Sequence, residues 1–126
     1  MTMTGEQSFA AGNVELRVEN RTLGEDGGPA VEVFADVDGA PVQVLRFDCF
    51  QRDPHYHYDP SGVNDKRDLS PDQVPDPIAW TLEQLRHHLP EMIRTAGFES
   101  TASNVDQTAV AGVLPEVESI MRGTDS

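Results

Sequence analysis

The stretch VEVFADVDGAPVQVL, residues 31–45, predicts a β-hairpin. Its first half alternates small apolar residues with charged or aromatic ones, which is the two-residue period of a strand with one buried face. The dipeptide Asp38-Gly39 follows, and it favours a tight turn because glycine adopts a positive φ without steric cost. The second half then returns as the antiparallel partner strand. The segment 14–18 shows the same alternation and predicts a third strand beside them.

The return strand of this hairpin does not keep one apolar face. A two-residue turn places Ala35 opposite Val42 and Val33 opposite Val44. Beyond that point the apolar residues change to the other face of the strand; they are Leu45, Phe47 and Cys49. One explanation is a β-bulge near Leu45. The other is that both faces are covered, in which case a partner subunit would bury the second face.

The C-terminal third of the chain predicts two helices. Apolar residues recur at helical spacing over 78–96 and again over 110–121. Asp76-Pro77 predicts the start of the first helix, and Gly97 predicts its end. Pro90 and Pro115 each fall inside an apolar pattern, where proline is expected to kink or restart the helix. The fold class is therefore predicted as α+β, a three-stranded antiparallel meander followed by a long loop and a C-terminal helical hairpin packed on the sheet.

The segment 51–75 is the predicted long loop, because it has several prolines and no hydrophobic period. A short strand inside it is left open, since tyrosine favours strands. Residues 1–126 are expected to form a single domain, with 1–12 and 122–126 flexible.

The charge balance excludes some partners. Nine Lys and Arg residues against 22 Asp and Glu residues give a formal net charge of −13. Nucleic acids and anionic membrane surfaces are held mainly by Lys and Arg, so neither is an expected ligand. Cys49 is the single cysteine and excludes an intramolecular disulfide; we expect it to be inert packing. With no signal-peptide pattern and no long apolar run, we expect an acidic, soluble, cytoplasmic protein.

The segment PHYHYDP, residues 54–60, carries the chemistry of the chain, with two of the four histidines and both tyrosines. In an extended backbone His55, His57 and Asp59 project from one face and the tyrosines from the other. Two imidazoles and a carboxylate at this spacing can share one divalent transition metal such as Zn²⁺. The third ligand could instead come from elsewhere; the candidates are Asp48, His87 and His88. The alternative is structural, with imidazoles that hydrogen-bond to water or to nearby aspartates.

Two functions are compatible with these observations. The leading hypothesis is a non-catalytic binding or assembly module that forms a homodimer or larger homo-oligomer through the 51–75 segment. Its candidate contact residues are Asp48, Tyr56, Tyr58 and Trp80. The rival is a metal-dependent enzyme or metal-binding protein that uses His55, His57 and Asp59. The sequence leaves open whether the protein is an enzyme, and it assures no cofactor.

Overall fold

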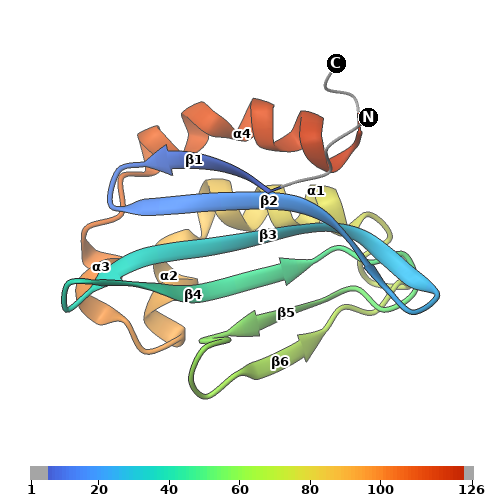
Figure 1. Ribbon diagram of the computed structural model, residues 1–126, viewed down its shortest axis with the longest axis horizontal. Helices are drawn as coiled ribbons and strands as arrows, with labels where there is room; N and C mark the ends of the chain where they lie inside the picture. Colours follow the sequence, from blue (N-terminus) through green and yellow to red (C-terminus); the bar gives the residue numbers. More distant parts are fainter. Residues whose placement is uncertain (1–5, 124–126) are drawn as a thin grey trace.

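The computed structural model describes residues 6–123, which form a six-stranded antiparallel sheet and four helices (Figure 1). The strands lie in the sheet in chain order, so each pairs with the strand before it and the strand after it. They are β1 (Gln7–Ala11), β2 (Val14–Leu23), β3 (Asp26–Val37), β4 (Ala40–Asp48), β5 (His55–Tyr58) and β6 (Asp65–Asp68).

The predicted α+β class is confirmed, but the three-stranded meander is wrong because the sheet has six strands. Strands β5 and β6 lie inside the segment 51–75 that was predicted to be a long loop. Strand β6 reads DKRD and has no apolar residue, so no hydrophobic period reveals it. It forms by backbone pairing with β5 at the edge of the sheet, where charged side chains remain in solvent.

Strand β1 corrects the prediction at the N-terminus. Gln7–Ala11 pairs along its whole length with β2, although residues 1–12 were predicted to be flexible. Only Phe9 and Ala11 of this strand turn toward the core, which is too short a pattern to detect. The remainder of the flexibility prediction falls mostly on residues 1–5 and 124–126, which lie outside the described residues.

The β3–β4 hairpin resolves the change of face in the return strand. Ala35 pairs with Val42 as predicted, but Val33 pairs with Leu45 and not with Val44. The register shifts at this point, so Val44 is an extra residue in β4. The bulge explanation is therefore the right one: it lets the residues on both sides of the shift, Val44 included, reach one core.

Four helices follow the sheet in the chain: α1 (Pro77–His87), α2 (Leu89–Thr95), α3 (Glu99–Ser103) and α4 (Gln107–Met121). Asp76 caps α1, accepting a hydrogen bond of 3.1 Å from the amide of Ala79. Pro90 separates α1 from α2 as predicted, and Gly97 follows the end of α2 with a φ of 103°. Pro115, in contrast, lies inside an unbroken α4, which is held by buried residues on either side of it. Among the described residues, no helix has the length and apolar character needed to cross a membrane.

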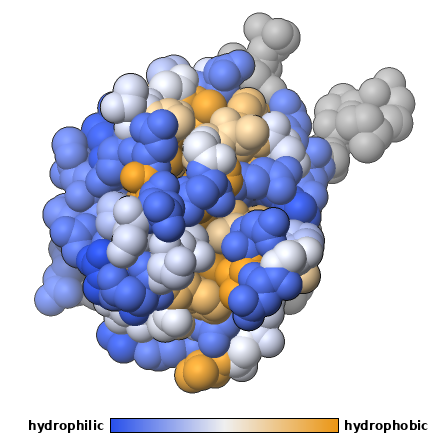
Figure 2. Space-filling view, turned by 90° about the vertical axis from the view of Figure 1, so that its left-hand side faces the viewer, coloured by the Kyte–Doolittle hydropathy of each residue, from blue (hydrophilic) through white to orange (hydrophobic). Residues whose placement is uncertain are grey.

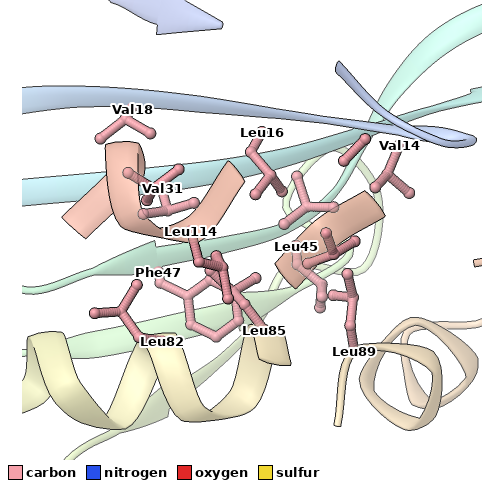
Figure 3. Packing of buried hydrophobic residues seen from close by; sticks show 14 of the residues in the cluster. Val14, Leu16, Val18, Val31, Leu45, Phe47, Leu82, Leu85, Leu89 and Leu114 are labelled. Atoms are coloured by element: carbon pink, nitrogen blue, oxygen red, sulfur yellow. The ribbon is translucent and has the colours of Figure 1, made fainter. Parts of the chain in front are cut away.

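The core lies between one face of the sheet and the helices. Figure 3 shows side chains of β2, β3 and β4 pointing toward leucines of α1, α2 and α4. Helix α4 contacts β1, β2 and β3, whereas α2 contacts β4 and β5. The predicted apolar stripes therefore do pack on the predicted sheet face, and the hydrophobic effect of this burial is the main stabilising term of the fold.

The other face of the sheet is polar. The strand register aligns one row of residues across five strands on this face: Arg17, Glu32, Arg46, His57 and Lys66. Neighbours in such a row have Cβ atoms about 5 Å apart, so their side chains are within reach of one another. Arg17, Glu32 and Arg46 thus alternate in charge along the outer face, and the candidate site lies beside Arg46 in this row.

Candidate metal centre

Asp48, His55 and His57 meet on the outer face of the sheet. Asp48 is the last residue of β4 and is paired with His55, the first residue of β5. His57 projects from the same face as His55 because it lies two residues farther along the strand. All three are buried, with exposed fractions of 1%, 7% and 6% respectively.

One carboxylate oxygen of Asp48 is the meeting point of the two imidazoles. The Nε2 atom of His55 lies 3.0 Å from Oδ2 of Asp48, and Nε2 of His57 lies 3.5 Å from the same oxygen. Among the described residues, these three form a group whose possible ligand atoms all lie within 4.8 Å of one another. The arrangement brings two nitrogen atoms and one oxygen atom that could bind a metal to a common point.

The far nitrogen of each ring is held by an oxygen. Nδ1 of His55 donates to the backbone carbonyl of Asp53 at 2.8 Å. Nδ1 of His57 donates to the side-chain oxygen of Asn64, also at 2.8 Å. Since both Nδ1 atoms are donors, both rings are fixed with Nε2 directed toward Asp48.

The Asp48 carboxylate is also surrounded by arginine. Nε of Arg46 donates to Oδ2 at 3.1 Å, and a terminal nitrogen of Arg21 donates to Oδ1 at 3.5 Å. Burial opposes ionisation of Asp48, but the hydrogen bond from His55 and the charge of Arg46 outweigh it and lower its pKa. The site therefore contains a buried carboxylate that stays ionised.

The two histidines differ in protonation. The hydrogen bond to Asp48 raises the pKa of His55, and both of its ring nitrogens face acceptors, as in an imidazolium ion. Burial, followed by the charge of Arg46, lowers the pKa of His57. A terminal nitrogen of Arg46 donates to Nε2 of His57 at 3.0 Å, so this nitrogen presents a lone pair. His57 is a neutral ring with Nε2 as the acceptor.

Asp59, the carboxylate that the spacing suggested, lies outside this group. It follows β5 with a φ of 52°, so the chain has already left the alternation that would place Asp59 beside His57. Its side chain instead accepts a hydrogen bond of 2.9 Å from the amide of Val63 in the next turn. His87 and His88, the other candidate ligands, are exposed residues at the end of α1 and are not part of the group either.

The aromatic contact candidates lie on the opposite side of the sheet. The ring of Tyr56 packs at 5.0 Å from Trp80 and at 6.0 Å from Phe47. Tyr58 packs on Tyr56 at 5.5 Å, and the guanidinium of Arg67 lies over its ring. These rings join β5 to α1 and do not face Asp48.

Three groups that complete the site were not predicted from the sequence: Arg46, Asn64 and the carbonyl of Asp53. Arg46 could have been found, because Arg46 and Asp48 lie two residues apart on a strand and so share a face. Asn64 could not, since its approach depends on the β5–β6 turn, where Asp59 and Asn64 both have a positive φ. The Asp53 segment is held by Asp26, whose carboxylate accepts hydrogen bonds from the amides of Arg52 and Asp53, each at 2.9 Å.

A surface pocket lies near the site but does not include it. It has a volume of about 570 Å³ and is lined by the segment 49–51, the start of α1 and the end of α4. None of the three clustered residues lines it. The cluster is therefore a buried group of side chains on the outer face of the sheet, outside this pocket.

The comparisons with known proteins place the chain in a family. The profile of that family, described as a domain of unknown function (DUF7700), matches residues 8–121. The chain belongs to this family. No curated protein and no solved structure matches the chain. The match covers β2 to α4 and most of β1, so the candidate centre lies within the family domain.

Proposed function

We propose that this protein binds a divalent transition metal, with Zn²⁺ as the best fit, through Asp48, His55 and His57. The observation that carries the proposal is the spacing of the donor atoms. Zinc binds imidazole nitrogen and carboxylate oxygen at about 2.0–2.2 Å, so the edges of its tetrahedron are about 3.3–3.5 Å long. The two nitrogen–oxygen separations in the cluster, 3.0 and 3.5 Å, fit such an edge with small adjustments.

The outer hydrogen bonds support the same conclusion. Histidine ligands of metals almost always donate their second ring N–H to a carbonyl, carboxylate or similar acceptor, which fixes the ring and raises its basicity. The Asp53 carbonyl and the Asn64 side chain supply these acceptors. Two nitrogens and one carboxylate oxygen suit zinc and other first-row divalent metals better than calcium or magnesium, which prefer oxygen.

We assign metal binding and no reaction. The three candidate ligands are at most 7% exposed, and the surface pocket beside them is not lined by any of the three. A metal in this position would link the end of β4 to β5. Strands β5 and β6 form the edge of the sheet that the sequence did not predict. Its contribution would therefore be to the folding and stability of this edge.

Metal analysis of the tag-free protein tests the proposal. We expect about one zinc ion per chain after supplementation with zinc, nickel and iron, and a higher melting temperature in zinc than in a chelator. His57→Ala should abolish binding. His88→Ala is the matched control, because His88 is exposed and lies outside the cluster, and it should bind like the wild type. A wild type with less than about 0.1 metal ion per chain would show that the cluster is only a structural ion-pair network.

Self-association and a cytoplasmic location stay predictions. The apolar residues on the second face of the return strand suggested a partner subunit, and the bulge at Val44 now accounts for them. At the end of the molecule seen in Figure 2, hydrophobic residues are visible in a few patches among hydrophilic ones. Light scattering at high protein concentration would decide whether the chain forms a homodimer.

A further inference from the structure

Arg46 lies where a metal ion would have to be. Its Nε is 3.1 Å from Oδ2 of Asp48, and its terminal nitrogen is 3.0 Å from Nε2 of His57. Oδ2 of Asp48 and Nε2 of His57 are also two of the atoms that would coordinate zinc in the proposed site. The guanidinium thus bridges a carboxylate and an imidazole and holds them at a spacing suited to the metal.

Metal and guanidinium cannot share this position. The lone pair of His57 Nε2 accepts the hydrogen bond from Arg46, and coordination would need the same lone pair. A divalent cation bound there would also lie within a few ångströms of the positive charge of Arg46, in a buried environment where repulsion is weakly screened. Arg46 must therefore move, and His55 must release its Nε2 proton to solvent, before a metal can bind.

The neighbouring strand offers a place for the displaced side chain. Glu32 of β3 is paired with Arg46 of β4, and both project from the outer face. Glu6 and Glu19 lie beside Glu32, and carboxylate oxygens of the three are within 4.8 Å of one another. Burial and these neighbouring carboxylates raise the pKa of Glu32 to about 7. A guanidinium that arrived at this cluster would relieve the repulsion among its carboxylates.

We propose that Arg46 is a built-in competitor for the metal, a side chain that holds Asp48 and His57 together without metal and moves to the Glu32 cluster when metal binds. The proposal rests on the proposed metal-binding function and adds its regulation. Metal binding and the contact between Arg46 and Glu32 then support each other, so the affinity of the site depends on a residue that is not a ligand.

Zinc affinity, measured by competition with a chromogenic chelator, tests this mechanism. Arg46→Met removes the competing charge and keeps most of the side-chain length, so it should bind zinc at least about tenfold more tightly than the wild type. Arg52→Met is the matched control. It removes an equal charge that is exposed and pairs with the exposed Glu25, away from Asp48 and from the Glu32 cluster, and it should change the affinity by less than about threefold.

Glu32→Gln tests the second position of Arg46. It should weaken zinc binding by about threefold in the wild type and have no effect when combined with Arg46→Met, because the cluster acts only through the arginine. If Arg46→Met fails to fold, the Nε–H signal of Arg46 in the NMR spectrum of the wild type provides a second measurement. We expect this signal to shift and to exchange faster with solvent when zinc is added.

The outcomes separate the two proposals. Zinc binding by the wild type that is unchanged or weaker in Arg46→Met would overturn the competitor role and leave the metal site in place. The competitor role would also be overturned if the NMR signals of the His57 ring nitrogens show zinc coordination while the Nε–H signal of Arg46 does not shift. Absence of zinc binding in the wild type would instead overturn the proposed metal-binding function, even if Arg46→Met binds zinc.

Discussion

The Nδ1 atom of His57 lies 2.8 Å from the side-chain oxygen of Asn64, so a turn residue fixes the ring of a residue in β5. The turn between β5 and β6 begins at Asp59 and ends at Asn64, and both have a positive φ. Asparagine and aspartate tolerate this conformation better than most residues. The turn thus both reverses the chain and supplies the acceptor for His57.

Replacement of Asn64 by glycine should weaken metal binding without damage to the turn. Glycine accepts a positive φ at no cost but has no oxygen for His57. Loss of such an outer hydrogen bond costs about 10- to 100-fold in metal affinity, and we expect a loss in this range for Asn64→Gly. Asn64→Asp keeps an acceptor and is the control. Isothermal titration with zinc measures both, and wild-type affinity in Asn64→Gly would contradict the role of Asn64.

Removal of the Asp48 carboxylate should destabilise the fold strongly. The side chain of Asp48 is 2% exposed and contacts Arg46 and both histidines, so Asp48→Ala leaves buried charges without a partner. We expect a loss of about 3–5 kcal/mol in the free energy of unfolding. Urea denaturation in the presence of a chelator measures this loss apart from any metal.

Asp53 provides the matched control for Asp48. Its carboxylate is 59% exposed and lies 3.9 Å from Nδ1 of His55, while its backbone carbonyl keeps the hydrogen bond to that ring. Asp53→Ala should therefore cost less than about 0.5 kcal/mol. Equal costs for the two variants would show that the Asp48 network contributes little to stability.

The sequence predicted those features of the fold that depend on residues close together in the chain. The turn at Asp38-Gly39, the cap at Asp76 and the break before Pro90 depend on residues near in the chain, and each lies where it was predicted. Strand β6 depends on pairing with β5, which leaves no mark in its own composition. The number of strands was therefore beyond the reach of hydrophobic periodicity.

In the candidate site, too, the features that depend on local sequence were predicted and those that depend on strand pairing were not. The alternation of β5 predicted that His55 and His57 share a face, because this follows from strand geometry alone. The carboxylate beside them depends on register between two strands, and the register pairs Asp48 with His55. Asp59 is nearer in sequence, but its positive φ turns it away. Local spacing therefore predicted that the two imidazoles share a face and left Asp48 as one of several candidate third ligands, whereas the pairing of β4 with β5 is what places Asp48 beside them.

Cys49 should not react in the folded protein. Its thiol contacts the hydroxyl of Thr81 at 3.2 Å, and burial raises its pKa to about 12. At pH 8 the thiolate, which is the reactive form, is then a very small fraction of the total. We expect no mass increase with iodoacetamide at pH 8 in buffer, and one added group per chain in guanidinium chloride. Rapid modification of the native protein would show that the segment after β4 opens readily.

Glu32 should make stability depend on pH. Its pKa is raised from 4.5 to about 7, first by burial and then by neighbouring carboxylates. Between these pH values the folded state holds a proton that the unfolded state releases, so the free energy of unfolding falls as pH rises through this window. The charged groups that face Glu32 are Glu6, Glu19 and Arg21, with Arg17 and Arg46 paired to it on the adjacent strands.

Glu32→Gln should remove this dependence. At pH 5 the variant should match the wild type, and at pH 8 it should be more stable by about 1 kcal/mol, a value reduced for solvent screening of a half-buried group. Glu116→Gln removes an equal charge on the exposed side of α4 and serves as the control. Urea denaturation at the two pH values measures the difference. A variant that keeps the wild-type slope between pH 5 and 8 would contradict this assignment.

Two glycines should respond to alanine in opposite directions. Gly112 lies inside α4, and a Cβ atom added there would meet nothing within 4 Å. Gly112→Ala should therefore stabilise the protein by about 0.5–1 kcal/mol, because alanine loses less backbone entropy on folding. Gly97 also has open space around it, but its φ of 103° is strained for alanine, so Gly97→Ala should destabilise by about 1 kcal/mol or more. Thermal denaturation of the two variants separates the effect of backbone conformation from that of packing, because neither substitution creates a clash. A loss of stability in Gly112→Ala would show that this side of α4 is not free to accept a methyl group.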